Sequence, residues 1–140
     1  MNYKLLILLL TISVFTACND DKKVEEQAFK EVMEIHDEVM PEMGTLRGLA
    51  KSLRAKIDSL ESDSTEMILK KKDEMKKLAE SLDEANESMM EWMRQFEQLE
   101  EGTPHGEVMN YLKEQREAVG KVRDQMLTAK KQGEYYLENN

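Results

Sequence analysis

Residues 68–99 read ILKKKDEMKKLAESLDEANESMMEWMRQFEQL, and the spacing of the apolar side chains in this stretch decides the fold. The apolar positions recur every three or four residues, almost as a strict heptad repeat: Ile68, Met75, Leu78, Leu82, Ala85, Met89, Trp92, Phe96 and Leu99. In an α-helix this spacing places them on one face, where they can be buried against other helices. The stretch therefore predicts one long amphipathic helix.

The same spacing continues on both sides of this stretch. The preceding segment carries Phe29, Met33, His36, Met40, Met43, Leu46, Leu49, Leu53, Ile57 and Leu60, and the following one carries Val108, Leu112, Val119, Val122, Met126, Ala129 and Tyr136. Polar residues interrupt the pattern at Glu61 to Ser64 and again at Gly102, after which Thr103 is the expected N-cap and Pro104 the first helical residue. The sequence predicts helices over about 24–60, 64–100 and 104–137 and no strands.

Short connections between long helices force sequence neighbours to run antiparallel. We therefore expect an all-α fold, an antiparallel up-down-up three-helix bundle over residues 24–138. Pro41 lacks a backbone donor, so a kink is expected near it, either as plain curvature, which we favour, or as functional strain. A dimeric or trimeric coiled coil is the alternative, against which the polar interruptions near Asp63 and Thr103 argue.

The N-terminus has the layout of an export signal. Lys4 precedes an apolar run from Leu5 to Phe15, and small Ala17 stands directly before Cys18, the only cysteine. This resembles the lipobox of bacterial lipoproteins. The resemblance implies that residues 1–17 are a signal peptide and that the thiol and the new amine of Cys18 carry acyl chains such as palmitate. An uncleaved anchor or a buried free cysteine is the alternative, but the apolar run is too short to span a bilayer.

Residues 18–23 are polar and are expected to form a lipidated tether. Their acidic residues, Asp20 and Asp21, also resemble the surface-export signal of Bacteroidetes lipoproteins, with a solvated linker as the equal alternative. The expected location is the cell envelope, as an outer-membrane lipoprotein facing the periplasm or the cell surface.

The composition excludes several classes of protein. There are 29 acidic and 20 basic residues, a formal charge of −9, which disfavours nucleic acid as a partner. With Cys18 acylated, no thiol remains for a disulfide, a metal site or catalysis. No phosphate-binding glycine loop, haem-attachment motif or nucleophile elbow occurs. The sequence predicts a non-enzyme without a cofactor, whose partners are the membrane, through its lipid, and an unknown envelope protein; the oligomeric state stays open.

Antiparallel pairing of the first two helices places His36 opposite Met89. The layer around this pair is the predicted interaction site: Met33, Asp37, Glu38, Met90, Trp92 and Arg116. Within it, His36 and Met40, and likewise Met89 and Met93, are four residues apart on one helix face. Imidazole and thioether groups are soft ligands that suit Cu(I), so these four residues are the candidate copper ligands. The favoured interpretation is simpler, because methionine commonly fills helix interfaces.

Two stretches, His36 to Met43 and Ser88 to Met93, resemble small helical lipoproteins of the Bacteroidetes that are sometimes labelled viral A-type inclusion proteins. The resemblance covers a small part of the chain and implies no activity. The functional prediction is a lipid-anchored helical module that presents an acidic surface to another envelope protein, with copper(I) binding or buffering as the alternative.

Overall fold

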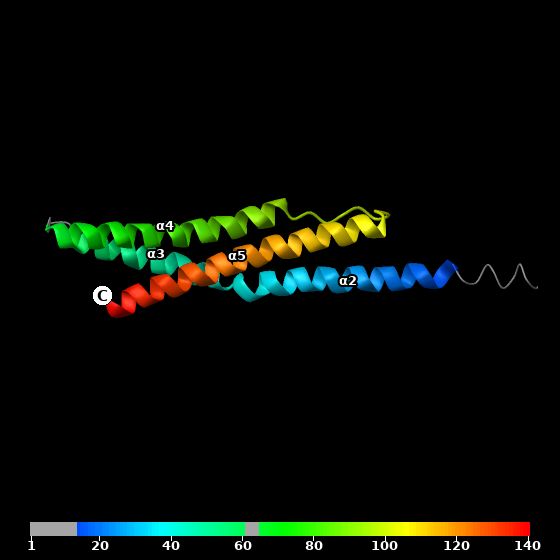
Figure 1. Ribbon diagram of the computed structural model, residues 1–140, viewed down its shortest axis with the longest axis horizontal. Coiled ribbons are helices and arrows are strands. Elements are labelled where there is room, and N and C mark those ends of the chain that lie inside the picture. The colour runs from blue at the N-terminus through cyan, green and yellow to red at the C-terminus, as the bar shows by residue number, and fades with distance from the viewer. Residues whose placement is uncertain (1–13, 61–64) are drawn as a thin grey trace, which may run out of the picture.

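The computed structural model describes residues 14–60 and 65–140, and all regular structure in them is α-helical. Helix α2 spans Val14–Val39, α3 spans Glu42–Ser59, α4 spans Glu66–Gln95 and α5 spans His105–Asn139. In Figure 1, α2 and α3 follow one another as a bent first rod, and α4 and α5 run beside it. The predicted all-α fold with a bent first helix is confirmed.

The bend is a break of the helix at Pro41. The Met40 N–H donates to the carbonyl of His36 at 2.9 Å and closes α2, whereas Pro41 has no N–H to offer the carbonyl of Asp37. The Met43 N–H then donates to the carbonyl of Met40 at 3.3 Å, and α3 continues from Glu42. Proline thus divides one amphipathic segment into two helices that can follow different neighbours.

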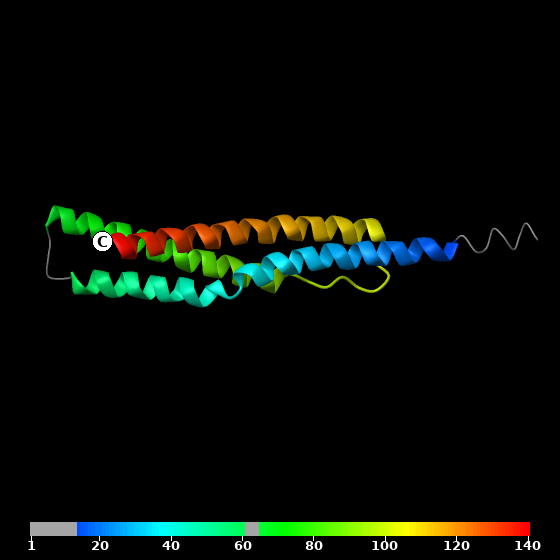
Figure 2. The same ribbon diagram turned by 90° about the horizontal axis from the view of Figure 1, so that it is seen from below.

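Helix α5 is the element that the other helices share. It packs against α2 at one end of the molecule and against α3 and α4 toward the other, while α3 packs against α4 (Figures 1 and 2). Its buried face consists of Leu112, Val119, Met126, Ala129, Gly133 and Tyr136. At Gly133 the helices approach closely, since an added Cβ atom would lie 3.2 Å from Leu82 Cδ1. One continuous helix therefore holds the two parts of the first rod in one body.

The core contains most of the apolar positions that the spacing predicted, but the stripe of α2 is shifted. The fully enclosed large side chains are Leu46, Leu53, Met75, Leu82, Met89, Met126, Val32, Val39 and Val119. In α2 the buried residues are Val32 and Val39, seven positions apart, rather than Met33 and Met40. Because α2 packs mainly on α5, its valine face turns inward and Met40 is 37% exposed.

Ion pairs join the first rod to α5. Glu31 Oε2 lies 3.2 Å from Arg116 Nη1, and Glu38 Oε2 lies 3.9 Å from Arg123 Nη1. The two residues of each pair are separated by the same number of positions along the sequence. Moving forward along α2 therefore means moving forward along α5, which indicates that the two helices run in the same direction. Lys130 Nζ adds a contact of 2.8 Å to Glu42 Oε2 at the start of α3.

Three boundaries differ from those predicted. Helix α4 ends at Gln95 instead of near residue 100, and the chain from 96 to 104 is not helical. Helix α5 begins at His105 with Pro104 as its N-cap, while the Thr103 hydroxyl donates to the carbonyl of Glu100 at 2.8 Å. Helix α2 runs through the tether, residues 18–23. Residues 1–13 of the predicted signal peptide and the side chain of Cys18 lie outside what the structure describes.

The contact between Glu42 and Lys130 predicts a pH-dependent contribution to stability. The hydrogen bond from Lys130 lowers the pKa of Glu42 below its usual value of 4.5, so the contribution is present above pH 4.5 and is lost as the pH falls through the lowered pKa. Glu42→Gln is expected to reduce the free energy of unfolding by up to about 1 kcal/mol at pH 7. In urea titrations the difference from the parent protein should vanish at acidic pH.

Glu34→Gln is the matched control, because Glu34 pairs with Lys30 within one exposed helical turn at 3.7 Å and links no two helices. Its effect should be smaller. A deficit of Glu42→Gln that is equally large at pH 7 and pH 3 would contradict the predicted role of the carboxylate charge.

Candidate functional site

Four elements bring aromatic side chains together at one end of the bundle. The ring centroids of His36 in α2 and Trp92 in α4 are 5.7 Å apart, and those of Trp92 and Phe96 are 5.0 Å apart. Phe96 also lies 6.0 Å from Phe29 of α2 and 6.0 Å from Tyr111 of α5. These separations are typical of attractive aromatic pairs. Phe96, the first residue after α4, is the centre of this aromatic cluster.

Hydrogen bonds fix two of these rings. The indole N–H of Trp92 donates to Gln115 Oε1 of α5 at 3.0 Å. The Tyr111 hydroxyl accepts from the Glu97 N–H at 2.8 Å and donates to the Glu97 carbonyl at 2.8 Å. The Tyr111 side chain therefore satisfies both backbone groups of a residue beyond the end of α4. This contact holds the segment 96–104, which is extended from Phe96 and turns at Glu101 and Gly102, against α5.

A hollow of about 310 Å³ lies beside the aromatic cluster. Its lining residues come from α2, α4 and the extended segment: Phe29, Met33, His36, Trp92, Met93, Phe96 and Gln98. His36 is half-buried, and its Nδ1 lies 2.8 Å from Asp37 Oδ1. This contact leaves Nε2 as the ring nitrogen available to a ligand.

The structure separates the four predicted copper ligands. His36 and Met93 line the hollow together with Met33. Met89 is fully buried in the core, and Met40 is exposed at the break between α2 and α3. One imidazole, that of His36, and two thioethers, those of Met33 and Met93, therefore line one hollow. Met40 and Met89, which were predicted as ligands, do not line it, whereas Met33 does.

Of the predicted interaction layer, Met33 and Trp92 line the hollow beside His36, whereas the other residues lie elsewhere around the molecule. Glu38 and Arg116 belong to ion pairs along the contact of α2 with α5. Asp37 is exposed beside His36, Met90 is 39% exposed, and Trp92 is buried with 6% of its surface accessible. Residues at one level of a helical bundle point in different directions around their helix axes, so they do not all share one surface.

Tyr111 and Gln98 belong to this region but were not predicted from the sequence. Tyr111 lies outside the apolar series predicted for the third helix, and its position matters only because α4 ends early. The available signal was the scarcity of aromatic residues: the chain has one tryptophan, three phenylalanines and four tyrosines.

A second surface feature is an open groove between α4 and α5. The groove encloses about 650 Å³, and its residues are Glu84, Glu87, Ser88, Glu91, Trp92, Gln95, Ala118, Val122 and Gln125. Three carboxylates line its α4 side, whereas α5 contributes the small apolar side chains of Ala118 and Val122. The groove therefore combines an acidic wall with an apolar floor.

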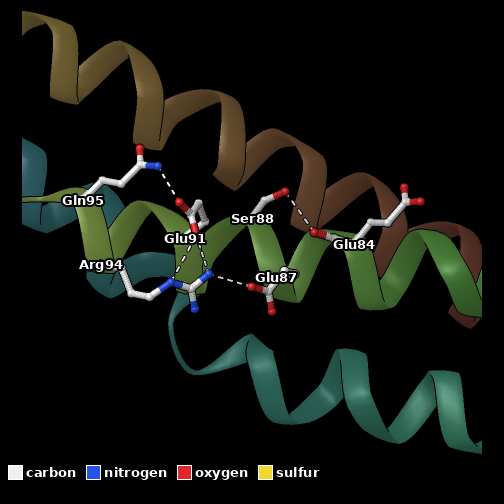
Figure 3. Close-up of polar contacts among 6 residues, drawn as sticks. All are labelled: Glu84, Glu87, Ser88, Glu91, Arg94 and Gln95. Carbon is white, nitrogen blue, oxygen red and sulfur yellow. Dashed lines mark hydrogen bonds and ion pairs between the residues drawn. The ribbon is translucent and has the colours of Figure 1, made fainter.

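Arg94 organises the acidic wall, as Figure 3 shows. Its guanidinium group lies 2.6 Å from Glu87 Oε1 and also contacts Glu91, which accepts a further hydrogen bond from Gln95. Hydrogen bonding to Arg94 lowers the pKa of Glu91, so this carboxylate stays ionised. With Glu84, three carboxylates stand against the single positive charge of Arg94, so the wall keeps a net negative charge.

Two further properties bear on function. Among residues 14–60 and 65–140, no three His, Cys, Asp or Glu side chains come together in a group that could hold a metal ion. None of the helices in this part of the chain combines the length and the apolarity that crossing a bilayer requires.

Comparison with known proteins places part of the chain in a known family. A family described as "four helix bundle sensory module for signal transduction" matches residues 45–136. The match covers α3 from Thr45, all of α4, and α5 as far as Tyr136, whereas α2 lies before it. No curated protein and no solved structure matches the chain.

The two hydrogen bonds of Tyr111 predict a loss of stability in Tyr111→Phe. Removing the hydroxyl leaves the N–H and the carbonyl of Glu97 without this partner, which is expected to cost about 1 to 2 kcal/mol of unfolding free energy. Urea titration followed by Trp92 fluorescence measures the change. Tyr135→Phe is the control, since Tyr135 is 68% exposed, and should change stability by less than about 0.5 kcal/mol. Equal effects of the two substitutions would contradict the assigned role.

Proposed function

Because this chain belongs to the family of four-helix-bundle sensory modules for signal transduction, we propose that it is a non-enzymatic signalling or interaction module of the cell envelope, anchored by lipid on Cys18. The family match carries the proposal, since it covers more than half of the 140 residues. It describes a sensory module and not a catalytic domain. Helices joined by short connections suit this role, because they transmit a displacement along their length.

The proposed arrangement is an up-down-up bundle whose first rod points toward the membrane. The ion pairs Glu31–Arg116 and Glu38–Arg123 have the same separation along the sequence, which supports a parallel arrangement of α2 and α5. In Figure 1 the beginning of α2 projects past the start of α5. A helical stalk of this kind would hold the bundle away from the lipid, whether it faces the periplasm or the cell surface.

The surface proposed for the envelope partner is the groove between α4 and α5. Its apolar floor offers area for contact, and the carboxylates of Glu84, Glu87 and Glu91 favour a partner with a cationic face. The formal charge of −9 likewise favours cationic partners over the whole surface, and it disfavours nucleic acid. We propose that a basic helix or loop of an envelope protein binds there.

Lipidation and partner binding can be tested in one set of strains. A photo-crosslinking residue replaces Gln125 in the groove, and cells are fed an alkyne-labelled fatty acid. We expect a labelled protein in the membrane fraction and a discrete crosslinked product. With Cys18→Ser, the fatty-acid label and the product should both be lost, because the module leaves the membrane.

Lys113 is the matched control position, since it lies on the same helix but lines the depression between α5 and α2. A probe there should give no such product. Fatty-acid label that persists in Cys18→Ser excludes the lipid anchor, and identical products from both probe positions exclude the groove as the binding surface.

Cu(I) binding is the second candidate function, and one observation favours it. His36, Met33 and Met93 line the same hollow and offer the soft nitrogen and sulfur donors that Cu(I) prefers. We expect competition with a Cu(I) chelator to give a Kd well below about 1 μM that weakens at least tenfold in His36→Ala. Met67→Leu is the control, because Met67 is 68% exposed. Micromolar or weaker affinity, or affinity unchanged in His36→Ala, ends the copper proposal.

A further inference from the structure

A second hollow lies beside the segment 96–104 and is lined by residues of α2, of this segment and of α5. It encloses about 390 Å³, a volume within the range of small-molecule pockets, which is roughly 300 to 1,000 Å³. Its walls are the middle of α2, from Lys22 to Phe29, the segment 96–104 and the first two turns of α5. Because the Tyr111 hydroxyl holds Glu97 in place, the segment forms a defined wall.

Aromatic and aliphatic side chains form the apolar part of this hollow. Phe29, Phe96 and Tyr111 all line it, and Phe96 stands 6.0 Å from each of the other two rings. The face of an aromatic ring carries negative partial charge and attracts cations. This part of the hollow therefore suits a ligand that has an apolar body and a positive charge.

The polar part of the hollow is strongly acidic. Its carboxylates belong to Glu25, Glu26, Glu97, Glu100 and Glu101, and its one lysine is Lys22. Glu25 is held by His105, whose Nδ1 lies 2.8 Å from Glu25 Oε1. The other carboxylates surround a half-open apolar space, so their combined field attracts cations and repels anions.

We propose that this hollow binds a small organic cation, an ammonium group carried on an aromatic or short alkyl body. The ammonium group lies among the carboxylates of the extended segment, and the body rests on Phe29, Phe96 and Tyr111. This ligand site is separate from the groove proposed for the envelope partner. If the chain is a sensory module, as proposed above, small organic cations are the class of signal that it detects.

The proposed site has a built-in reporter. Trp92 is the only tryptophan of the chain, and its ring centroid lies 5.0 Å from that of Phe96. A ligand that rests on Phe96 changes the surroundings of Trp92, whose N–H is fixed to Gln115. Binding is therefore expected to alter the intensity or wavelength of Trp92 emission.

The test compares three probes of similar size on the purified full-length protein: 2-phenylethylammonium, neutral 2-phenylethanol and anionic 3-phenylpropanoate. We expect saturable changes in Trp92 fluorescence with the cation, at least about tenfold weaker binding of the alcohol, and none of the anion. Equal binding of cation and alcohol, or no saturable response to the cation, would overturn the proposal.

A charge variant locates the site. Glu97→Gln, Glu100→Gln and Glu101→Gln are combined, because all three residues are exposed and lie outside the helices. This variant should weaken binding of the cation at least about tenfold and leave that of the alcohol unchanged. The matched control combines Glu66→Gln, Glu114→Gln and Glu117→Gln, three exposed helical residues outside the hollow, and removes the same net charge. Equal weakening in both variants would show a general charge effect and reject the site.

Discussion

Burial of one continuous face of α5 is the constraint on which the rest of the structure depends. Every other helix packs against α5, and its enclosed positions follow one another from Leu112 to Tyr136. No neighbouring helix covers this whole length alone: α2 covers one part and α3 with α4 another. Apolar area removed from water along this face supplies the main stabilisation, about 25 cal/mol per Å². The ion pairs of Glu31, Glu38 and Glu42 with α5 fix how the helices are aligned lengthwise, and they contribute little to the free energy of unfolding.

Two interruptions of helical structure create the candidate functional region. Pro41 ends α2 and lets its valine face turn to α5, which leaves Met33 and His36 at the flank. Helix α4 ends at Gln95, so its place at that end of the molecule is taken by the extended segment 96–104. An extended chain covers less surface than a helix with its side chains. Two hollows therefore lie against Phe96.

Much of the fold could be predicted from the pattern of residues. The heptad spacing indicated the helices, and Pro41 indicated the bend, because both effects act within a few residues along the chain. The site was only partly predictable. Antiparallel pairing brought His36, Trp92 and Met93 to one level, but it could not show that Met89 turns into the core while Met40 faces solvent. Those orientations depend on which neighbour each helix chooses.

The sequence by itself determined that the chain is helical, where its first rod bends and that its surface is acidic, because helix propensity, proline geometry and charge are properties of local residues. Only the tertiary structure decided that α4 ends at Gln95 and that Tyr111 holds the segment beyond it. Helical hydrogen bonds beyond Gln95 compete with the packing of Phe96 among three aromatic rings and with the hydroxyl of Tyr111. That competition is settled by partners that meet only when the chain is folded.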